Sequence, residues 1–422
     1  MAKDIFPPRG MRDFLPQEKA KRERVLGVIR ETYKVHGYQE IETPALEDLV
    51  RLTSGQGGDN EKLAYRVMKR GAELAAAVGF QSDEDRSKMI HPGLVNSEAN
   101  EITDKFADLG LRFDLTVPLT RYYATNFSKL PRVFKAIQTG PVWRAERPQK
   151  GRYRQFVQCD IDIIGDDSEL AEVDLLVSSL DALRAVGVAD AVIRVNHRAL
   201  LAELLDGLGV PESGRGKAMI IIDKLDKIFA EGVVAELGEA FGESVGSAFA
   251  GWVSTLKAGD VPASLASLFD AVSVRHPGKL VFDPTLVRGM GYYTGTIFEI
   301  SHPASGSSIG GGGRYDGMVG RWTGNDVPAV GISLGFERVV DLVAGLDAAS
   351  AGVVLVLEDG SAEVTAAALR VQADLIALGH NVRLELRPKK LNLLLESMVE
   401  QGFTQWAPVD ASTASVSLKP LA

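Results

Sequence analysis

The stretch from residue 142 to 165, VWRAERPQKGRYRQFVQCDIDIIG, carries a dense set of side chains able to do chemistry. It is predicted to form two strands separated by a break at ERPQKG. Successive side chains of a strand point to opposite faces, so positions 153, 155, 157, 159, 161 and 163 form one largely apolar face. The other face carries Arg154, Phe156, Gln158, Asp160 and Asp162. A solvated sheet face could show the same pattern, but this strand lies among segments typical of a buried core.

Basic side chains crowd the break between these two strands: Arg144, Arg147, Lys150, Arg152 and Arg154. The planar guanidinium fork of arginine matches phosphate oxygens, and an aromatic ring offers a stacking face to a base. The combination of this basic turn with Phe156 indicates a site for a planar ligand that carries phosphate.

Four further blocks stand out along the chain: LRFDLTVPLTRY (111–122), LVRGMGYYTGTIFEI (286–300), GGGGRYDGMV (310–319) and AVGISLGFERVV (329–340). Alone, the second could be a glycine-kinked hairpin with core aromatics, the third a flexible turn, and the fourth ordinary packing of a strand and a helix.

In their order along the chain these blocks resemble the histidyl-tRNA synthetases, a family of class II aminoacyl-tRNA synthetases. The stretch 142–165 is similar to motif 2 of that family, with Trp143 where phenylalanine is common. The resemblance implies that Arg144 contacts the α-phosphate of ATP. It also implies that Glu146 reads the adenine amino group and that Phe156 stacks on adenine.

Other residues of these blocks are implied to bind histidine. Gln158 would help to hold the α-amino group, and Asp162 would face the imidazole, where bacterial members often have glutamate. From the block 111–122, Asp114 and Thr116 become α-amino ligands, because an ammonium group needs an acceptor such as a carboxylate.

The block 286–300 resembles the histidine-specific segment of the family. Arg288 would then neutralise the reacting carboxylate and the α-phosphate, and Tyr292 and Tyr293 would contact histidine, Tyr293 through the imidazole. A pocket that satisfies both ring nitrogens rejects amino acids that lack them. The sequence departs from the family at Gly291, where an aspartate is usual.

The last two blocks add Tyr315, implied to line the histidine pocket, and Arg338 of motif 3, implied to grip the γ-phosphate. Arg144, Arg288 and Arg338 are the predicted catalytic residues, because preorganised charge stabilises the transition state. ATP with Mg²⁺ is expected as a substrate, without a tightly bound cofactor. The sequence does not identify the metal ligands.

Composition excludes several other classes of protein. The single cysteine rules out a cysteine-rich zinc site, and neither an HExxH nor a Walker A sequence is present. The net charge of −9 argues against a surface that wraps nucleic acid throughout, although a local basic patch remains compatible. No stretch approaches the roughly 20 apolar residues of a membrane span. The N-terminus lacks a signal-peptide core, so a cytoplasmic protein is expected.

The predicted fold is α+β. A catalytic core at 1–344 has the antiparallel sheet of class II synthetases, a polar insertion at about 55–108 and a helical insertion at about 198–274. An α/β domain resembling anticodon-binding domains follows at 353–422. Strands are predicted at 111–117 and 152–164, and a helix near 120–126. The segment GYQEIETP resembles motif 1, which forms a dimer interface, so the implied partners are a second copy, histidine, ATP and tRNA(His), and no membrane.

Two other functions stay open at this point. One is a histidine-binding regulatory relative that controls ATP phosphoribosyltransferase, although such relatives usually lack the C-terminal domain and the ATP-binding arginines. The other is an enzyme that activates histidine and passes it to an acceptor other than tRNA. The short, divergent C-terminal domain and Gly291 keep this second alternative in view.

Overall fold

The computed structural model describes residues 5–53, 63–79, 104–148, 152–255, 260–287, 292–344 and 352–421. Arg288, Gly291 and most of the predicted polar insertion lie outside these ranges. The chain divides into two compact units, one made of Met1–Arg12 and Leu26–Val343 and the other of Asp13–Val25 and Ala344–Ala422. Among the described residues, no helix is long and apolar enough to cross a membrane.

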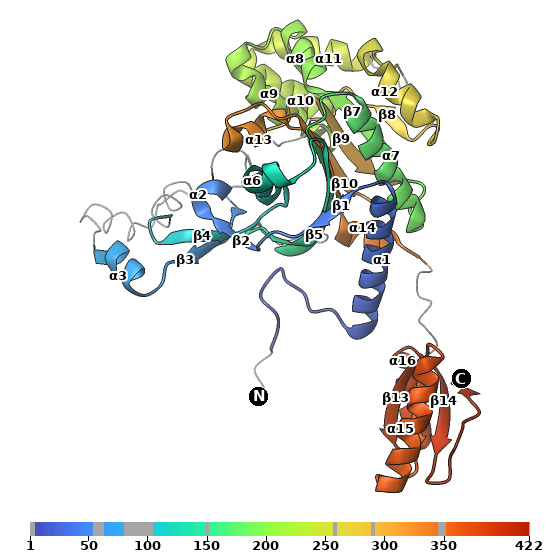
Figure 1. Cartoon of the computed structure of the whole chain (residues 1–422). Helices are drawn as coiled ribbons and strands as arrows, with labels where there is room; N and C mark the ends of the chain where they lie inside the picture. Colours follow the sequence, from blue (N-terminus) through green and yellow to red (C-terminus); the bar gives the residue numbers. More distant parts are fainter. Residues whose placement is uncertain are drawn as a thin grey trace. The chain divides into compact units, whose positions relative to one another are not determined.

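The first unit is built on an eight-stranded sheet in the order β1-β5-β6-β11-β10-β9-β7-β8 (Figure 1). From β5 to β7 each strand runs antiparallel to its neighbours, while the edge strands β1 and β8 pair in parallel. The strands span Gln39–Ile41 (β1), Phe134–Trp143 (β5), Gln155–Ile164 (β6), Ala329–Gly335 (β11), Gly310–Arg314 (β10), Thr296–Ser301 (β9), Val192–His197 (β7) and Leu280–Phe282 (β8). The predicted antiparallel core is therefore present.

Strand β6 lies near the middle of this sheet, and its two faces differ as the alternation predicts. Cys159, Ile161 and Ile163 are buried. Helix α7, Leu170–Ala185, packs against β6 and β11. The opposite face of β6 opens into a cavity.

Further elements complete the first unit, except that residues 16–25 of helix α1 belong to the second unit. A small sheet in the order β2-β4-β3 lies beside the large sheet. The helices from Arg198 to Thr255 share a core that includes Leu205, Leu237 and Phe249 and extends to Ile297 of β9. Helix α12 packs against α7 and β8 instead. The bounds are α1 Pro16–Val35, β2 Leu46–Asp48, α2 Leu49–Leu52, β3 Arg66–Met68, α3 Gly71–Gly79, β4 Ala107–Leu111, α6 Thr116–Asn126, α8 Arg198–Gly207, α9 Arg215–Ile222, α10 Leu225–Phe241, α11 Glu243–Thr255, α12 Ala263–Ser273, α13 Asp316–Thr323 and α14 Phe336–Leu342; single 3-10 turns lie at η2 Phe127–Lys129 and η3 Glu212–Gly214.

The strand predicted at 111–117 was wrong. Strand β4 ends at Leu111, and helix α6 already begins at Thr116. The Asp114 carboxylate accepts a hydrogen bond from Val117 N at 3.1 Å, which satisfies a backbone donor of the first helical turn. The alternating apolar residues Phe113, Leu115 and Val117 are buried, but they are buried at a turn and a helix start rather than along a strand.

The glycine run at 310–313 is not the flexible turn that it would suggest on its own, because these residues form strand β10. Their lack of side chains allows close pairing on both sides. A Cβ on Gly312 would lie 1.9 Å from Gly331 O, and one on Gly313 would lie 2.6 Å from Thr296 O. The run therefore serves packing within the sheet.

The second unit contains a sheet in the order β13-β12-β14-β15, parallel except for β15. Val353 and Leu355 of the central strand pack with helix α15, and Val354 and Val356 pack with helix α16, which is the pattern of a strand covered on both faces. The elements are β12 Gly352–Leu357, α15 Ala362–Ala377, β13 Asn381–Leu386, α16 Leu391–Glu400, β14 Phe403–Val409 and β15 Lys419–Pro420.

Candidate active site

A cavity of about 520 Å³ opens on the face of the large sheet. Of the twelve residues that the sequence predicted for the site, eleven line it, and Arg288 lies outside the described residues. They come from β6, α14, the start of α6, the segment after β5, and the segments before β9 and after β10. The lining members are Asp114, Thr116, Arg144, Glu146, Phe156, Gln158, Asp162, Tyr292, Tyr293, Tyr315 and Arg338. What each of them binds stays a prediction.

Strand β6 sets the length of the cavity. Phe156 and Asp162 face the same side six residues apart, and a strand rises about 3.3 Å per residue, so they lie about 20 Å apart. The sequence neighbours on that face, Gln158 and Asp160, lie between them. We call the part around Asp162, Tyr292, Tyr293 and Tyr315 the tyrosine end, and the part around Arg144, Glu146, Phe156 and Arg338 the arginine end.

At the tyrosine end the side chains contact one another. The Tyr315 hydroxyl donates to Asp162 Oδ1 at 2.6 Å, and both residues are buried. The ring centroid of Tyr292 lies 6.1 Å from that of Tyr315 and 4.7 Å from that of Tyr293, with edge-on geometry in both pairs. Gly331 makes the room for this contact, because its Cβ would fall 1.9 Å from Asp162 Oδ1.

Burial decides the protonation of this end. Burial raises the pKa of Asp162 to about 7. The hydrogen bond from Tyr315 lowers this pKa, and the charge of Asp114 raises it further. Burial likewise raises the pKa values of Tyr292 and Tyr315 well above the ordinary value of tyrosine. The two phenols therefore stay neutral donors at physiological pH, while Asp162 can gain or lose a proton there.

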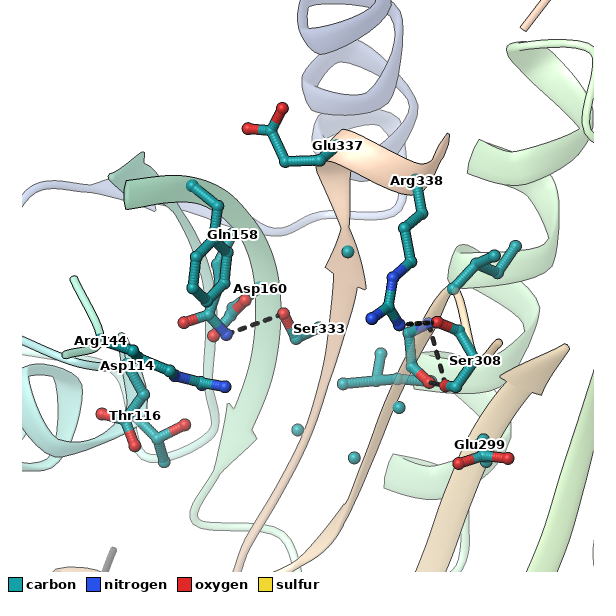
Figure 2. A pocket seen from close by; sticks show the side chains of 18 of the residues that line it. Asp114, Thr116, Arg144, Gln158, Asp160, Glu299, Ser308, Ser333, Glu337 and Arg338 are labelled. Carbon is teal, nitrogen blue, oxygen red and sulfur yellow. Dashed lines mark hydrogen bonds between the residues drawn. The ribbon is translucent and has the colours of Figure 1, made fainter. Parts of the chain in front are cut away.

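At the arginine end the side chains are held by the main chain. Arg144 Nε donates to Phe113 O at 3.0 Å, and its guanidinium carbon lies 5.1 Å from the centroid of the Phe156 ring. Burial lowers the pKa of Arg144, and the charges of Asp114 and Glu146 act in the opposite direction. Arg338 donates to the carbonyl of Ser308. Figure 2 shows Arg144 beside Asp114 and Thr116, with Arg338 and Ser308 across the sheet face.

The middle of the cavity holds a residue for which the sequence suggested a face but no role, Asp160. It is 4% exposed, and its Oδ1 has no hydrogen-bond partner among the described residues. Burial, and then the charge of Asp162, raises the pKa of Asp160 well above its ordinary value. Its strand neighbour Gln158 donates from Nε2 to Ser333 Oγ at 3.1 Å (Figure 2). The alternation of side chains along the strand predicted that Asp160 lies on this face.

A buried ion pair next to Tyr315 supports the tyrosine end. Arg314, which precedes Tyr315, donates from Nε to Glu172 Oε1 at 2.6 Å and from Nη2 to Glu172 Oε2 at 2.5 Å. Thr296 Oγ1 donates to the same carboxylate at 3.0 Å. This bidentate pair ties the end of β10 to helix α7, and it fixes the backbone from which Tyr315 projects.

Carboxylates that could contact a magnesium ion line the cavity. Glu146, Glu299 and Glu337 line the cavity. No group of three or more histidine, cysteine or carboxylate side chains gathers into a metal cluster within the described part of the chain. This donor set suits a metal that arrives with phosphate, because Mg²⁺ usually takes one or two protein carboxylates, substrate oxygens and water.

Comparison with known proteins gives a consistent result. The family model described as histidyl-tRNA synthetase matches residues 10–80 and 97–339. Histidine–tRNA ligase of Leifsonia xyli is 49% identical and covers 100% of this chain and 99% of its own length. A probable histidine–tRNA ligase of Tropheryma whipplei is 39% identical over 96% of both chains.

Solved structures give the same picture for the fold. The crystal structure of histidyl-tRNA synthetase from Nostoc sp. PCC 7120 superposes with a TM-score of 0.75 at 26% identity, covering 99% of this chain and 95% of its own. A structure from Bacillus halodurans, described as an ATP phosphoribosyltransferase regulatory subunit/histidyl-tRNA synthetase, superposes with a TM-score of 0.70 at 18% identity, covering 97% of this chain and 99% of its own. This second likeness concerns the fold alone.

Proposed function

The chain belongs to the histidyl-tRNA synthetase family, and from this membership we propose a role for each side chain of the cavity. It is a histidine–tRNA ligase, an enzyme that joins histidine to tRNA. The observation that carries the assignment of roles is the contrast along β6. A hydrogen-bonded Asp162–Tyr315 pair lies at one end, and Arg144 beside the Phe156 ring lies at the other.

The arginine end binds ATP in this proposal. Phe156 stacks on the adenine, and Glu146 accepts a hydrogen bond from the adenine amino group. Arg144 contacts the α-phosphate and Arg338 the γ-phosphate. The support is that all four side chains line one end of the cavity and that guanidinium groups bind phosphate oxygens well.

The tyrosine end binds the imidazole of histidine. Asp162 and Tyr293 contact the ring, and Tyr292 and Tyr315 enclose it. The α-amino group lies toward Asp114, Thr116 and Gln158. In support, Asp114 and Thr116 lie next to Arg144, so an amino acid held there would present its carboxylate to the α-phosphate (Figure 2).

Positioning and charge then suffice for the first step. A carboxylate oxygen of histidine attacks the α-phosphorus, the bond to the oxygen that bridges to the β-phosphate breaks, and pyrophosphate leaves. No side chain acts as nucleophile. Arg144, Arg338 and, by family resemblance, Arg288 hold the groups in line and stabilise the developing charge. The terminal hydroxyl of tRNA(His) then attacks the activated carbonyl, and AMP leaves.

Magnesium is proposed to bind in the same cavity. Glu299 is the carboxylate from which a ligand would come, together with phosphate oxygens of ATP, because Glu146 is assigned to the adenine and Glu337 is paired with Arg12. When bound, the ion neutralises phosphate charge. The chain itself is proposed to carry no other cofactor.

The proposal extends to the assembly and to the domains. The resemblance of GYQEIETP to motif 1 supports a homodimer formed through the region of β1. The catalytic core is assigned to 1–344 and an anticodon-binding-like domain to 353–422. The second unit supports the latter assignment, because it is a mixed sheet packed against helices α15 and α16.

The two other functions receive less support. A regulatory relative without ATP chemistry has no need for a cavity that gathers Arg144 and Arg338, and both line this one. The likeness to ligases also extends over the whole chain, including the second unit.

Charging of a histidine tRNA transcript with labelled histidine, ATP and Mg²⁺ tests the proposal. We expect charging by the wild-type protein and its loss in Arg288→Ala. Histidine-dependent ATP–pyrophosphate exchange without charging of the tRNA would instead indicate another acceptor. Absence of both activities in a folded protein would favour the regulatory function.

A further inference from the structure

The segment PRGMR, residues 8–12, takes part in none of the roles proposed above, yet it contacts the arginine end of the cavity. Arg154 N donates to the carbonyl of Gly10 at 2.8 Å, and Arg144 N donates to the carbonyl of Arg154 at 2.9 Å. Arg154 Nε also donates to Glu146 O at 3.0 Å. The start of the chain is thus bonded to the residue that holds the main chain of both Arg144 and Glu146.

Arg12 makes a second connection, to motif 3. Its guanidinium lies 3.6 Å from the centroid of the Tyr153 ring and forms an ion pair with Glu337 Oε2. The Glu337 side chain is 8% exposed, and that of Arg12 is 30% exposed. Glu337 Oε1 accepts from Val157 N at 3.1 Å. One carboxylate therefore joins the start of the chain to β6, directly between Phe156 and Gln158.

Gly10 allows this close passage. Its φ of +83° lies in the region that favours glycine, and a Cβ there would fall 2.8 Å from Pro148 Cγ and 2.9 Å from Arg154 Cγ. The segment therefore packs in close contact with Pro148 and Arg154, which flank the motif 2 turn.

Glu337 is the neighbour of Arg338, and Val157 is the neighbour of Phe156. The groups that the segment holds are therefore those that flank the proposed ATP contacts. Removal of Arg12 would leave the nearly buried Glu337 carboxylate without this counter-charge, and such a group draws in water or changes its rotamer. Either response displaces Arg338 relative to β6.

We propose that residues 8–12 form a strap across the arginine end, in which the Arg12–Glu337 ion pair positions Phe156 and Arg338 for ATP. Arg12 is a positioning residue and touches no substrate. The proposal rests on the assignment of ATP to this end. It gives the strap no influence on the tyrosine end, where the hydrogen bond between Tyr315 and Asp162 involves none of its residues.

Steady-state ATP–pyrophosphate exchange on Arg12→Gln tests the strap. The KM for ATP should rise about tenfold, which corresponds to the loss of roughly one hydrogen-bonded charge contact. The KM for histidine should stay close to that of the wild type. Arg12→Lys keeps the charge but not the planar contact with Tyr153, so its KM for ATP should lie between those of the wild type and Arg12→Gln. Arg9→Gln is the matched control, because the described contact of Arg9 uses its carbonyl.

A double-mutant cycle separates positioning from general stability. If Arg12 acts through Glu337, then Arg12→Gln should add no further change in the Glu337→Gln background. An unchanged KM for ATP in Arg12→Gln, equal changes for both substrates, or additive effects in the cycle would overturn the strap. Should the wild type show no exchange at all, the proposed function fails. The strap is then judged by calorimetric titration of ATP into wild type and Arg12→Gln, where equal affinities would reject it.

Discussion

At the tyrosine end of the cavity the side chains hold one another, whereas at the arginine end they are held by main-chain carbonyls and by the start of the chain. Tyr315 bonds directly to Asp162, and both are buried. Arg144 and Arg338 instead donate to the carbonyls of Phe113 and Ser308. Side chains that fix each other in a core give a rigid, selective pocket. At the arginine end, Arg144 is held through its Nε, so its terminal nitrogens can bind a ligand. Substitutions at the two ends should therefore change different kinetic constants.

The largest effect is expected from Arg144→Ala at the arginine end. Loss of one preorganised donor to developing charge costs about 3–4 kcal/mol, or a fall in kcat of about 10²–10³-fold. ATP–pyrophosphate exchange measures it. Arg147→Ala is the control, because Arg147 is exposed on the same turn and does not line the cavity. A similar loss in both variants would show that general charge, not position, matters there.

Gly331→Ala should give the next largest effect, and at the opposite end. The new methyl group would collide with Asp162 Oδ1, so the carboxylate must move. A displacement of about 1 Å can reduce a rate by about 10²-fold, and we expect this loss in kcat/KM for histidine. Gly317→Ala is the control, because a Cβ at the exposed Gly317 meets nothing within 4 Å. An unchanged kcat/KM in Gly331→Ala would mean that the position of Asp162 is not critical.

Asp162→Asn should raise the KM for histidine about 10–100-fold, because a buried hydrogen bond to a charged partner contributes about 1.5–3 kcal/mol. The KM for ATP should change little, and initial rates at varied concentrations of each substrate give both constants. Equal changes in the two constants would contradict the separation of the ends.

The same variant tests the raised pKa of Asp162. The unfolded carboxyl loses its proton near pH 4, while the folded one keeps it up to about pH 7. Between these values the unfolded state binds fewer protons, so this group lowers the free energy of unfolding by up to about 1.4 kcal/mol per pH unit as the pH rises. Asp162→Asn should therefore gain stability relative to wild type from pH 4 to 7 and no more above it. Urea unfolding at several pH values measures this gain, and a constant difference would refute the pKa.

The smallest effect is expected from Tyr315→Phe. It removes one hydrogen bond, from the tyrosine hydroxyl to Asp162, and should reduce kcat/KM for histidine about tenfold. Because that bond lowers the pKa of Asp162, its loss should also move the pH dependence of histidine binding to higher pH. A pH profile of kcat/KM that matches the wild type would contradict the proposed contact.

The sequence predicted the face of β6 well, because strand alternation is a local property and the side chains at 156, 158, 160 and 162 are chemically distinct. It left open a flexible turn for the glycine run at 310–313, since only the neighbouring strands reveal why side chains are excluded there. The start of α6 was missed because Phe113, Leu115 and Val117 alternate like a strand while Asp114 favours a helix start. The Arg12–Glu337 pair joins residues 325 positions apart, which no local pattern shows.

A crystal structure of the protein with histidine and a non-hydrolysable ATP analogue would test the division of the cavity. We predict the imidazole within hydrogen-bond distance of Asp162 at the tyrosine end, and the adenine against Phe156. The α-phosphate should lie on Arg144, facing the histidine carboxylate. Adenine at the tyrosine end, or an imidazole that makes no contact with Asp162, would contradict the roles assigned to both ends.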